Sequence, residues 1–320
     1  MKTPSFWKTR NWLANLLSPI GVIYGFLTYL RITFGLTRKV KVPVICLGNL
    51  TAGGTGKTPL AISLATALKA KGYNPFFVSR GYGGKLSDTL VDPLIHTPQQ
   101  VGDEPLLLAN HAPTIINSKR FKAAQKAINL GADLIIMDDG FQNPGLHKDL
   151  SLIVVDGAFG FGNRYCIPAG PLREKVWSGM HRADAVIIVG YDETDLTHRY
   201  KLKLPIFRAS IAPIKPEASK NNQVFAFAGI GRPSKFYGSL QELGFKIVET
   251  KDFPDHHYYT EAELQEIIKR AKELGTDIYT TGKDIVKIPA HIQKHFKVLE
   301  IEIKWRDEQK LLDFIEEKIK

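Results

Sequence analysis

The segment Gly48-Asn49-Leu50-Thr51-Ala52-Gly53-Gly54-Thr55-Gly56-Lys57-Thr58 directly follows an apolar run, Val42–Leu47. A β-branched run, a glycine-rich turn and a helix-forming segment (60–71) are the layout of a phosphate-binding loop. The glycines let successive backbone N–H groups point at the anionic oxygens of a nucleotide, Lys57 adds a positive charge, and the Thr58 hydroxyl can bind Mg²⁺. The stretch therefore predicts a nucleotide site where a buried strand meets a helix.

This loop departs from the usual pattern G-x-x-x-x-G-K-[ST] at one position, because Thr51 stands where the first glycine is expected. Several neighbouring glycines still allow the backbone angles that such a loop needs. A flexible loop without a ligand is the alternative, and the lysine and threonine at the helix start argue against it. The residues expected to contact the nucleotide are Thr51, Ala52, Gly53, Gly54, Thr55, Gly56, Lys57 and Thr58.

Two acids follow a second buried strand, Leu134–Met137. In a doubly wound sheet this strand can lie beside the first, so that Asp138 and Asp139 emerge at the same carboxyl edge as Thr58. A carboxylate at this edge can hold Mg²⁺ or one of its waters. The sequence does not separate the roles of the two acids, and an acid pair can also simply end a strand.

The positive charge of the chain is concentrated near its N-terminus. The 320 residues have a formal net charge of +11, and residues 1–41, which include Lys2, contain basic residues but no acid. A general nucleic-acid surface is therefore poorly supported, and no nucleic-acid partner is expected. The only two cysteines, Cys46 and Cys166, exclude a disulfide framework and favour a reducing, cytoplasmic compartment.

An uncharged apolar stretch, Trp12 to Leu30, lies between these basic residues. As a helix it would be about 28 Å long, close to the thickness of a bilayer core. A cleavable signal is disfavoured because no small-residue cleavage site follows, and a spanning helix would violate the positive-inside tendency. We expect a helix that lies on the inner leaflet with its basic residues at anionic headgroups. A helix buried against the domain or in a dimer is the alternative.

Strand-like and helix-like segments alternate along the rest of the chain, which predicts an α/β fold of the P-loop NTPase type with a doubly wound, mainly parallel sheet. The polar stretch Ser219–Gln223 indicates a linker, after which a second series of strands and helices begins. We therefore expect a membrane-associated segment (1–40), a phosphate-binding-loop core domain (41–215) and a smaller C-terminal α/β domain (216–320). A nucleotide would bind near the cleft between the two domains.

Several other polar residues lie at predicted helix starts or on loops. Asp103 and Glu104 open a helix predicted over 101–109, where acids are favourable for any helix. His256 follows Asp255, which could orient its imidazole, although an exposed loop histidine would look the same. Cations and a histidine on or near loops suit a phosphorylated substrate, and each could singly be a surface charge. These are Arg80, Arg173 and His181.

Together, these segments closely resemble the tetraacyldisaccharide 4'-kinases, the lipid A 4'-kinases of Gram-negative inner membranes. The resemblance covers nearly the whole chain, and its ordered set of motifs is highly specific. Thr51 fits the family's own variant of the phosphate-binding loop. The matching segments are the apolar N-terminus, 48–59, 79–84, 101–105, 137–142, 170–174, 181–184, 255–256 and 280–287.

The resemblance implies transfer of the γ-phosphoryl group of ATP to the 4'-hydroxyl of an acylated glucosamine disaccharide 1-phosphate. ATP and Mg²⁺ are the implied cofactors, with Lys57 at the triphosphate. Asp103 would be the general base, paired with His256. The implied metal-binding residues are Thr58, Asp138, Asp139 and Glu104.

For the lipid, the resemblance implies that Arg80 and Tyr82 belong to a flexible lid, and that Arg173 and His181 contact phosphate groups of the nucleotide or of the lipid. The acyl chains would stay in the bilayer, so that a monomeric enzyme at the cytoplasmic face of the inner membrane need not extract them. A nucleotide-driven switch or partitioning ATPase is a rival, but such proteins carry a lysine where this chain has Ala52. A soluble small-molecule kinase is disfavoured by the apolar N-terminus.

Overall fold

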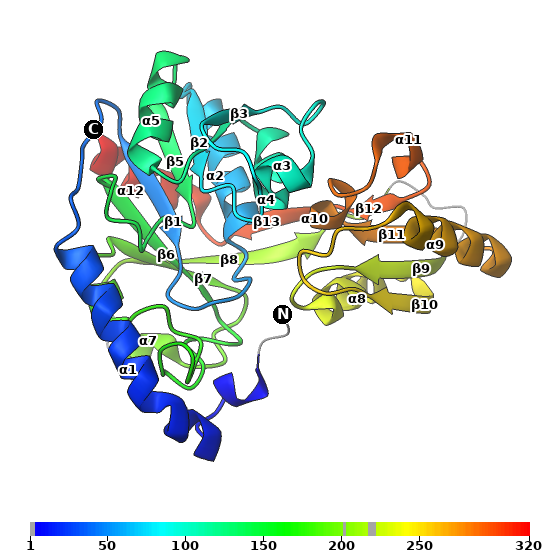
Figure 1. The fold of residues 1–320 in the computed structure, drawn as a ribbon, viewed down its shortest axis with the longest axis horizontal. Helices are drawn as coiled ribbons and strands as arrows, with labels where there is room; N and C mark the ends of the chain where they lie inside the picture. Colours follow the sequence, from blue (N-terminus) through cyan, green and yellow to red (C-terminus); the bar gives the residue numbers. More distant parts are fainter. Residues whose placement is uncertain (1–3, 201–202, 217–221) are drawn as a thin grey trace.

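The computed structural model describes residues 4–200, 203–216 and 222–320, which form two α/β units of unequal size (Figure 1). Lys2 and most of the predicted linker Ser219–Gln223 lie outside these described residues. We call the unit built on the nine-stranded sheet the large lobe, and the unit built on the four-stranded sheet the small lobe.

The sheet of the large lobe has the strand order β13-β8-β7-β6-β1-β5-β2-β4-β3. Neighbouring strands are parallel except at the two edges, where β3 pairs with β4 and β13 with β8 in antiparallel fashion. The mainly parallel sheet predicted from the sequence is thus confirmed. The strands are β1 (Val44–Gly48), β2 (Pro75–Ser79), β3 (Thr89–Val91), β4 (Thr114–Ile116), β5 (Leu134–Asp138), β6 (Leu150–Asp156), β7 (Ala185–Val189), β8 (Ile206–Pro213) and β13 (Ile301–Trp305).

Helices cover both faces of this sheet, and they bury the central strands completely. Apolar residues of α2 (Lys57–Ala70) and α12 (Glu308–Ile319) form the core on one face, and those of α5 (Arg120–Asn129) form it on the other. A strand enclosed in this way is apolar on both of its faces, which is why the runs in β1, β5 and β7 show no alternation. The shorter helices are α3 (Pro98–Val101), α4 (Asp103–Ala109), α6 (Val176–Met180) and α7 (Leu196–Arg199).

The small lobe has a parallel sheet of order β10-β9-β11-β12. Residues of α8 (Pro233–Glu242) pack on one face of this sheet and residues of α9 (Glu261–Leu274) on the other. Two short helices, α10 (Gly282–Ile285) and α11 (Ala290–Gln293), complete the lobe. The strands are β9 (Gln223–Ala228), β10 (Lys246–Asp252), β11 (Asp277–Thr281) and β12 (Lys297–Leu299).

The C-terminal segment corrects the predicted domain limits. Residues 216–320 were expected to form one C-terminal domain, but β13 pairs with β8 and α12 packs in the core of the large lobe. The chain therefore leaves the large lobe after β8 and returns to it through β13, as Figure 1 shows. The reason is local: Leu311, Leu312 and Ile315 give α12 an apolar face, and the face that buries it belongs to the larger sheet.

The N-terminal helix α1 (Trp12–Thr33) lies along the outside of the large lobe, preceded by a short 3-10 helix, η1 (Ser5–Trp7) (Figure 1). It is long and apolar enough to cross a membrane, judged by length and composition alone. A narrow strip of small residues packs on the lobe, and Gly21 lies so close to the Cys166 carbonyl that a Cβ would be 2.6 Å from it. Large apolar side chains face outward, namely Trp12, Leu16, Ile20, Val22, Ile23, Phe26 and Leu27.

Candidate active site

The phosphate-binding loop runs from the end of β1 to the start of α2, as predicted. The residue before α2, Gly56, has a left-handed φ of +83°, which glycine adopts without strain. Two backbone hydrogen bonds of 2.7 Å fix the first half of the loop: the Ala52 N–H donates to the Pro171 carbonyl, and the Arg173 N–H donates to the Leu50 carbonyl. A second segment of the large lobe therefore holds the loop in shape.

Asp138 lies beside the helix start because β5 pairs with β1. The Thr58 hydroxyl donates a hydrogen bond of 3.1 Å to Asp138 Oδ2, while Oδ1 is buried and has no hydrogen-bond partner among the described residues. Burial and the nearby carboxylate of Glu104 raise the pKa of Asp138 to about 7. A positive charge at this position would relieve both effects.

Asp139 occupies a different environment from its neighbour. Its Oδ1 lies 2.8 Å from Arg173 Nη1 and 3.5 Å from Lys57 Nζ. Burial alone would raise the pKa of Asp139, but the two cations outweigh it and lower this pKa to about 2. The structure thus separates the two acids, since Asp139 holds the cations of the loop and Asp138 faces the Thr58 hydroxyl.

The predicted metal residues do not form a complete protein cage. Among the described residues no group of three or more His, Cys, Asp or Glu side chains could hold a metal ion. Mg²⁺ does not require such a cage at a nucleotide site, because it binds one or two protein oxygens together with phosphates and waters. The Thr58 hydroxyl and the unpaired oxygen of Asp138 fit that requirement.

Asp103 and His256 come together across the boundary between the lobes. Asp103 opens α4 of the large lobe, and His256 lies on the loop that follows β10 in the small lobe. We call this loop, residues 253–260, the catalytic loop after the role proposed for His256 below. His256 Nδ1 lies 2.9 and 3.1 Å from the two carboxylate oxygens of Asp103. His256 lines the cleft between the lobes, whereas Asp103 is only 6% exposed and lies behind it.

This contact changes the pKa of both groups. The hydrogen bond that His256 Nδ1 donates to the Asp103 carboxylate raises the pKa of His256, with burial acting in the opposite direction. Burial would raise the pKa of Asp103, but its contact with His256 outweighs burial and lowers it. The pair therefore favours a carboxylate beside an imidazole that gains a proton readily.

Glu104 pairs with Lys283, for which the sequence predicted no role. Lys283 Nζ lies 2.6 Å from Glu104 Oε1, and this contact again joins the two lobes. Burial would lower the pKa of Lys283, but Glu104 outweighs it and raises that pKa. The available signal was the segment Thr280–Lys287, which matched the family without an assigned function.

The predicted substrate residues divide into two groups. Arg80, Tyr82 and Arg173 line the inter-lobe cleft of about 2540 Å³ together with the phosphate-binding loop and His256. Among the described residues that line this cleft, His181 is not found. Its Nδ1 instead lies 2.7 Å from the carbonyl of Trp177, on whose ring the imidazole packs edge to face.

The comparisons with known proteins agree with this geometry. Residues 13–320 match the family model of the tetraacyldisaccharide-1-P 4'-kinases, LpxK. The tetraacyldisaccharide 4'-kinase of Rhodospirillum rubrum is 47% identical over 90% of this chain and 89% of its own length. The enzyme of that name from Gluconobacter oxydans is 44% identical over 98% of each chain.

A solved structure is similar over the full length. The crystal structure of LpxK from Aquifex aeolicus in complex with ATP aligns with a TM-score of 0.80 and 29% identity, covering 96% of this chain and 100% of the other. The phosphate-binding loop, the inter-lobe pair and these similarities lead to one conclusion: the chain belongs to the tetraacyldisaccharide-1-phosphate 4'-kinase family.

Proposed function

We propose that this chain binds ATP and Mg²⁺ in the inter-lobe cleft and transfers the γ-phosphoryl group to the 4'-hydroxyl of a tetraacylated disaccharide 1-phosphate. Family membership supports the reaction, which is a step of lipid A biosynthesis. The observation that carries the proposal is that the phosphate-binding loop lines the same cleft as His256, which Asp103 contacts from behind. A nucleotide-driven switch would have no use for such a pair beside its loop.

The phosphates would lie over the backbone N–H groups of the loop, with Lys57 as a cation beside them. Lys57 and Arg173 are held near this position by Asp139, and a triphosphate would compete with Asp139 for both cations. Catalysis of phosphoryl transfer depends mainly on such positioning and charge neutralisation. We assign Arg173 to the nucleotide side of the cleft, because its N–H group is already bonded to the loop.

Mg²⁺ would be held by Thr58 and Asp138, where it would neutralise charge on the outer phosphates. Asp138 has the buried, unpaired oxygen. Burial raises the pKa of Asp138, and the nearby cations Lys57 and Lys283 do not offset this effect. Glu104 is paired with Lys283, so we assign it to orienting that lysine and not to binding the metal directly.

The Asp103–His256 pair would accept the proton of the attacking hydroxyl. The family resemblance implies that Asp103 is the base itself. The geometry favours His256 as the group that meets the hydroxyl, since His256 lines the cleft while Asp103 bonds to its Nδ1 from behind. Asp103 would then hold the imidazole in place and stabilise its protonated form.

One experiment tests the reaction as a whole. The full-length protein is incubated with γ-labelled ATP, Mg²⁺ and a tetraacylated disaccharide 1-phosphate in detergent micelles. We expect a labelled lipid with two phosphates. Steady release of labelled phosphate without any labelled lipid would contradict the proposal and favour the ATPase alternative.

We further propose that α1 attaches the enzyme to the cytoplasmic face of the inner membrane. Its outward face carries large apolar side chains over most of its length, whereas its inward strip of small residues packs on the large lobe. Replacement of three outward residues, Leu16→Glu, Ile20→Glu and Ile23→Glu, should abolish flotation with vesicles that contain anionic lipid. Unchanged flotation would contradict this arrangement.

A further inference from the structure

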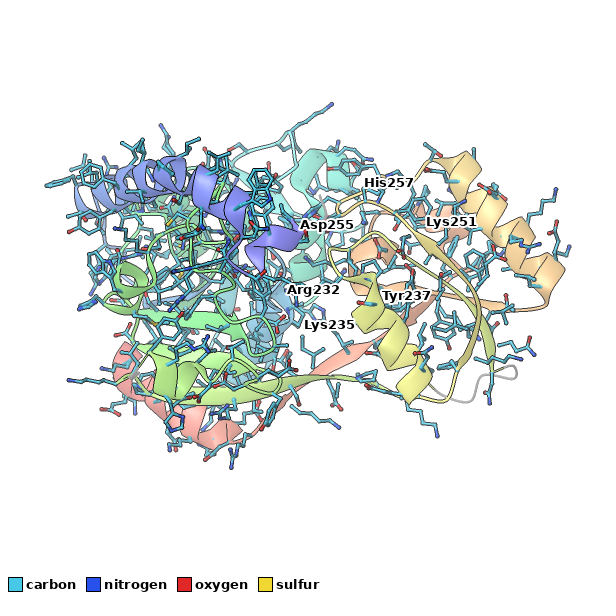
Figure 2. All side chains as sticks on the ribbon, turned by 90° about the horizontal axis from the view of Figure 1, so that it is seen from below. Arg232, Lys235, Tyr237, Lys251, Asp255 and His257 are labelled. Carbon is cyan, nitrogen blue, oxygen red and sulfur yellow. The ribbon has the colours of Figure 1, made fainter. Side chains whose placement is uncertain are left out.

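The structure contains an inter-lobe contact that the proposed reaction does not use. Asp156 ends β6, next to β1, and lies three residues beyond Ile153, which pairs with Gly48 at the start of the phosphate-binding loop. Its Oδ2 lies 2.6 Å from Arg232 Nη1 and 3.1 Å from Lys235 Nζ, at the beginning of α8. Figure 2 shows both cations on the side of the small lobe that faces the large lobe.

The carboxylate in this contact is held rigidly. Asp156 is 4% exposed, and its Oδ1 accepts a hydrogen bond of 3.1 Å from the Ala158 N–H. The guanidinium carbon of Arg232 also lies 5.2 Å from the centre of the Phe159 ring. A buried carboxylate is stable only when it is paired, so Asp156 strongly favours arrangements of the lobes that keep a cation against it.

The beginning of α8 is in turn packed against the catalytic loop. A Cβ on Gly229 would lie 2.8 Å from the Tyr259 hydroxyl and 3.1 Å from Asp284 Oδ1, and that hydroxyl donates a 2.8 Å hydrogen bond to Asp284. A Cβ on Gly231 would lie 3.4 Å from an oxygen of Asp255. A Cβ on Gly229 would also lie 3.3 Å from the Pro254 carbonyl, so the segment that precedes α8 lies directly against the catalytic loop. A shift of α8 should therefore move the catalytic loop with it.

The two attachments lie on opposite sides of the phosphate-binding loop. Asp103 belongs to α4, which packs on β2, β3 and β4, and these strands lie beyond β5 as counted from β1. Asp156 belongs to β6, the neighbour of β1 on the other side. His256 has a left-handed φ of +60°, which a histidine adopts only when its surroundings support it.

We propose that Asp156, with Arg232 and Lys235, forms a positioning site that fixes the catalytic loop over the phosphate-binding loop. Asp103 holds His256 from one side of the cleft, and Asp156 holds the small lobe from the other. The inference rests on the proposed role of His256 and adds the contact that keeps this residue correctly positioned relative to the bound nucleotide. It predicts that Asp156 affects catalysis only through its contacts with Arg232 and Lys235.

The first test is a double-mutant cycle on kinase activity. Asp156→Asn should lower kcat/KM about tenfold, and Arg232→Gln, which leaves Lys235 against Asp156, should lower it by no more than that. The double variant should be no worse than Asp156→Asn, because the link to both cations is already lost there. Arg232→Lys should keep most of the activity, and nucleotide affinity should stay unchanged throughout. Glu249→Gln, which breaks the exposed pair with Arg270 in the small lobe, is the matched control and should have no effect.

Two results of this cycle would overturn the proposal. Single effects that multiply in the double variant would mean that the residues act separately. Loss of activity in Arg232→Gln with full activity in Asp156→Asn would mean that the cations contact the lipid phosphate directly and not the catalytic loop through Asp156.

The second test measures the lobes without reference to catalysis. Spin labels at Gln125→Cys on α5 and Gln265→Cys on α9, both exposed, report the distance between the lobes in the full-length protein. We expect a broader distance distribution in Asp156→Asn and in Arg232→Gln, and no change in Glu249→Gln. An unchanged distribution in the first two variants would overturn the link.

The two tests also separate this inference from the proposed function. If the distance distribution broadens and His256→Asn keeps normal turnover, the proposed role of His256 is wrong but the link between the lobes is confirmed. Suppose that the distance distribution broadens and His256→Asn is inactive, but Asp156→Asn and Arg232→Gln keep normal kcat/KM. The link between the lobes then exists without positioning His256, and the inference fails.

Discussion

The phosphate-binding loop and the Asp103–His256 pair both belong to the inter-lobe site but are built in opposite ways. The loop is one continuous segment between β1 and α2, and its backbone carries most of its chemistry. The pair joins residues that are 153 positions apart and belong to different lobes. Substitutions in the loop therefore disturb only the local structure, whereas the Asp103–His256 contact is lost whenever the two lobes change their relative position.

The contacts that support the two regions differ accordingly. Hydrogen bonds to Leu50 and Ala52 hold the loop from within the large lobe. The pair depends on contacts between the lobes, such as Lys283 with Glu104 and the Tyr258 hydroxyl with the Gly83 carbonyl, 3.3 Å apart. Substitutions in the loop should then affect the nucleotide, and substitutions at the pair should spare it.

The largest effect is expected from Lys57→Ala. Loss of the cation beside the phosphates should lower kcat/KM about a thousandfold and weaken nucleotide binding, because the charge of the transferred group is no longer neutralised. Steady-state kinetics and titration with a fluorescent ATP analogue measure both quantities. Lys122→Ala on the exposed side of α5 is the control. Normal nucleotide affinity in Lys57→Ala would contradict the predicted role of the loop.

The next effect is expected from His256→Asn. Asparagine tolerates the left-handed backbone of this position, so the loop should keep its shape while the base is lost. Turnover should fall about a hundredfold or more, with nucleotide affinity unchanged. The exposed His295→Asn serves as control. If the fluorescent analogue no longer bound to His256→Asn, the assumed division between loop and pair would be wrong.

A smaller effect is expected from Gly102→Ala, which changes no reacting group. Gly102 has a φ of +92°, and a Cβ would lie 2.5 Å from the Tyr82 carbonyl, so alanine should displace the adjacent Asp103. We expect turnover to fall about tenfold through misplacement of the pair. Gly244→Ala carries a similar backbone strain at a residue that does not line the cleft and should leave turnover unchanged. Equal losses in both variants would point to general destabilisation.

The smallest effect is a displacement of the pH profile. The imidazole accepts a proton only when neutral, and Asp103 raises its pKa, so kcat/KM should fall on the acid side at a pH above the ordinary histidine value of 6.5. Asp103→Asn removes the raising contact and should move this acid limb to lower pH, while the maximum rate also decreases. An unmoved limb would mean that another group titrates there.

How well the structure could be predicted follows the same division between a continuous segment and a contact between the lobes. The loop, Asp138 and Asp139 were placed correctly at one sheet edge because strand, turn and helix follow each other directly in the chain. Asp103 and His256 were paired through the family resemblance, and periodicity alone offered no reason to join them. His181, which the resemblance places at a phosphate group, does not line the cleft; it follows α6, and its Nδ1 lies 2.7 Å from the Trp177 carbonyl.

The sequence by itself determined the α/β class, the nucleotide loop and the apolar N-terminal helix, since each is encoded in consecutive residues or in a short period. Tertiary structure alone decided that β13 and α12 return to the large lobe, that Lys283 reaches Glu104, and that Arg232 reaches Asp156. The physical reason is the distance along the chain over which each interaction acts. Backbone preferences and side-chain periodicity act over a few residues, while a contact between lobes depends on how whole sheets pack, which no single segment encodes.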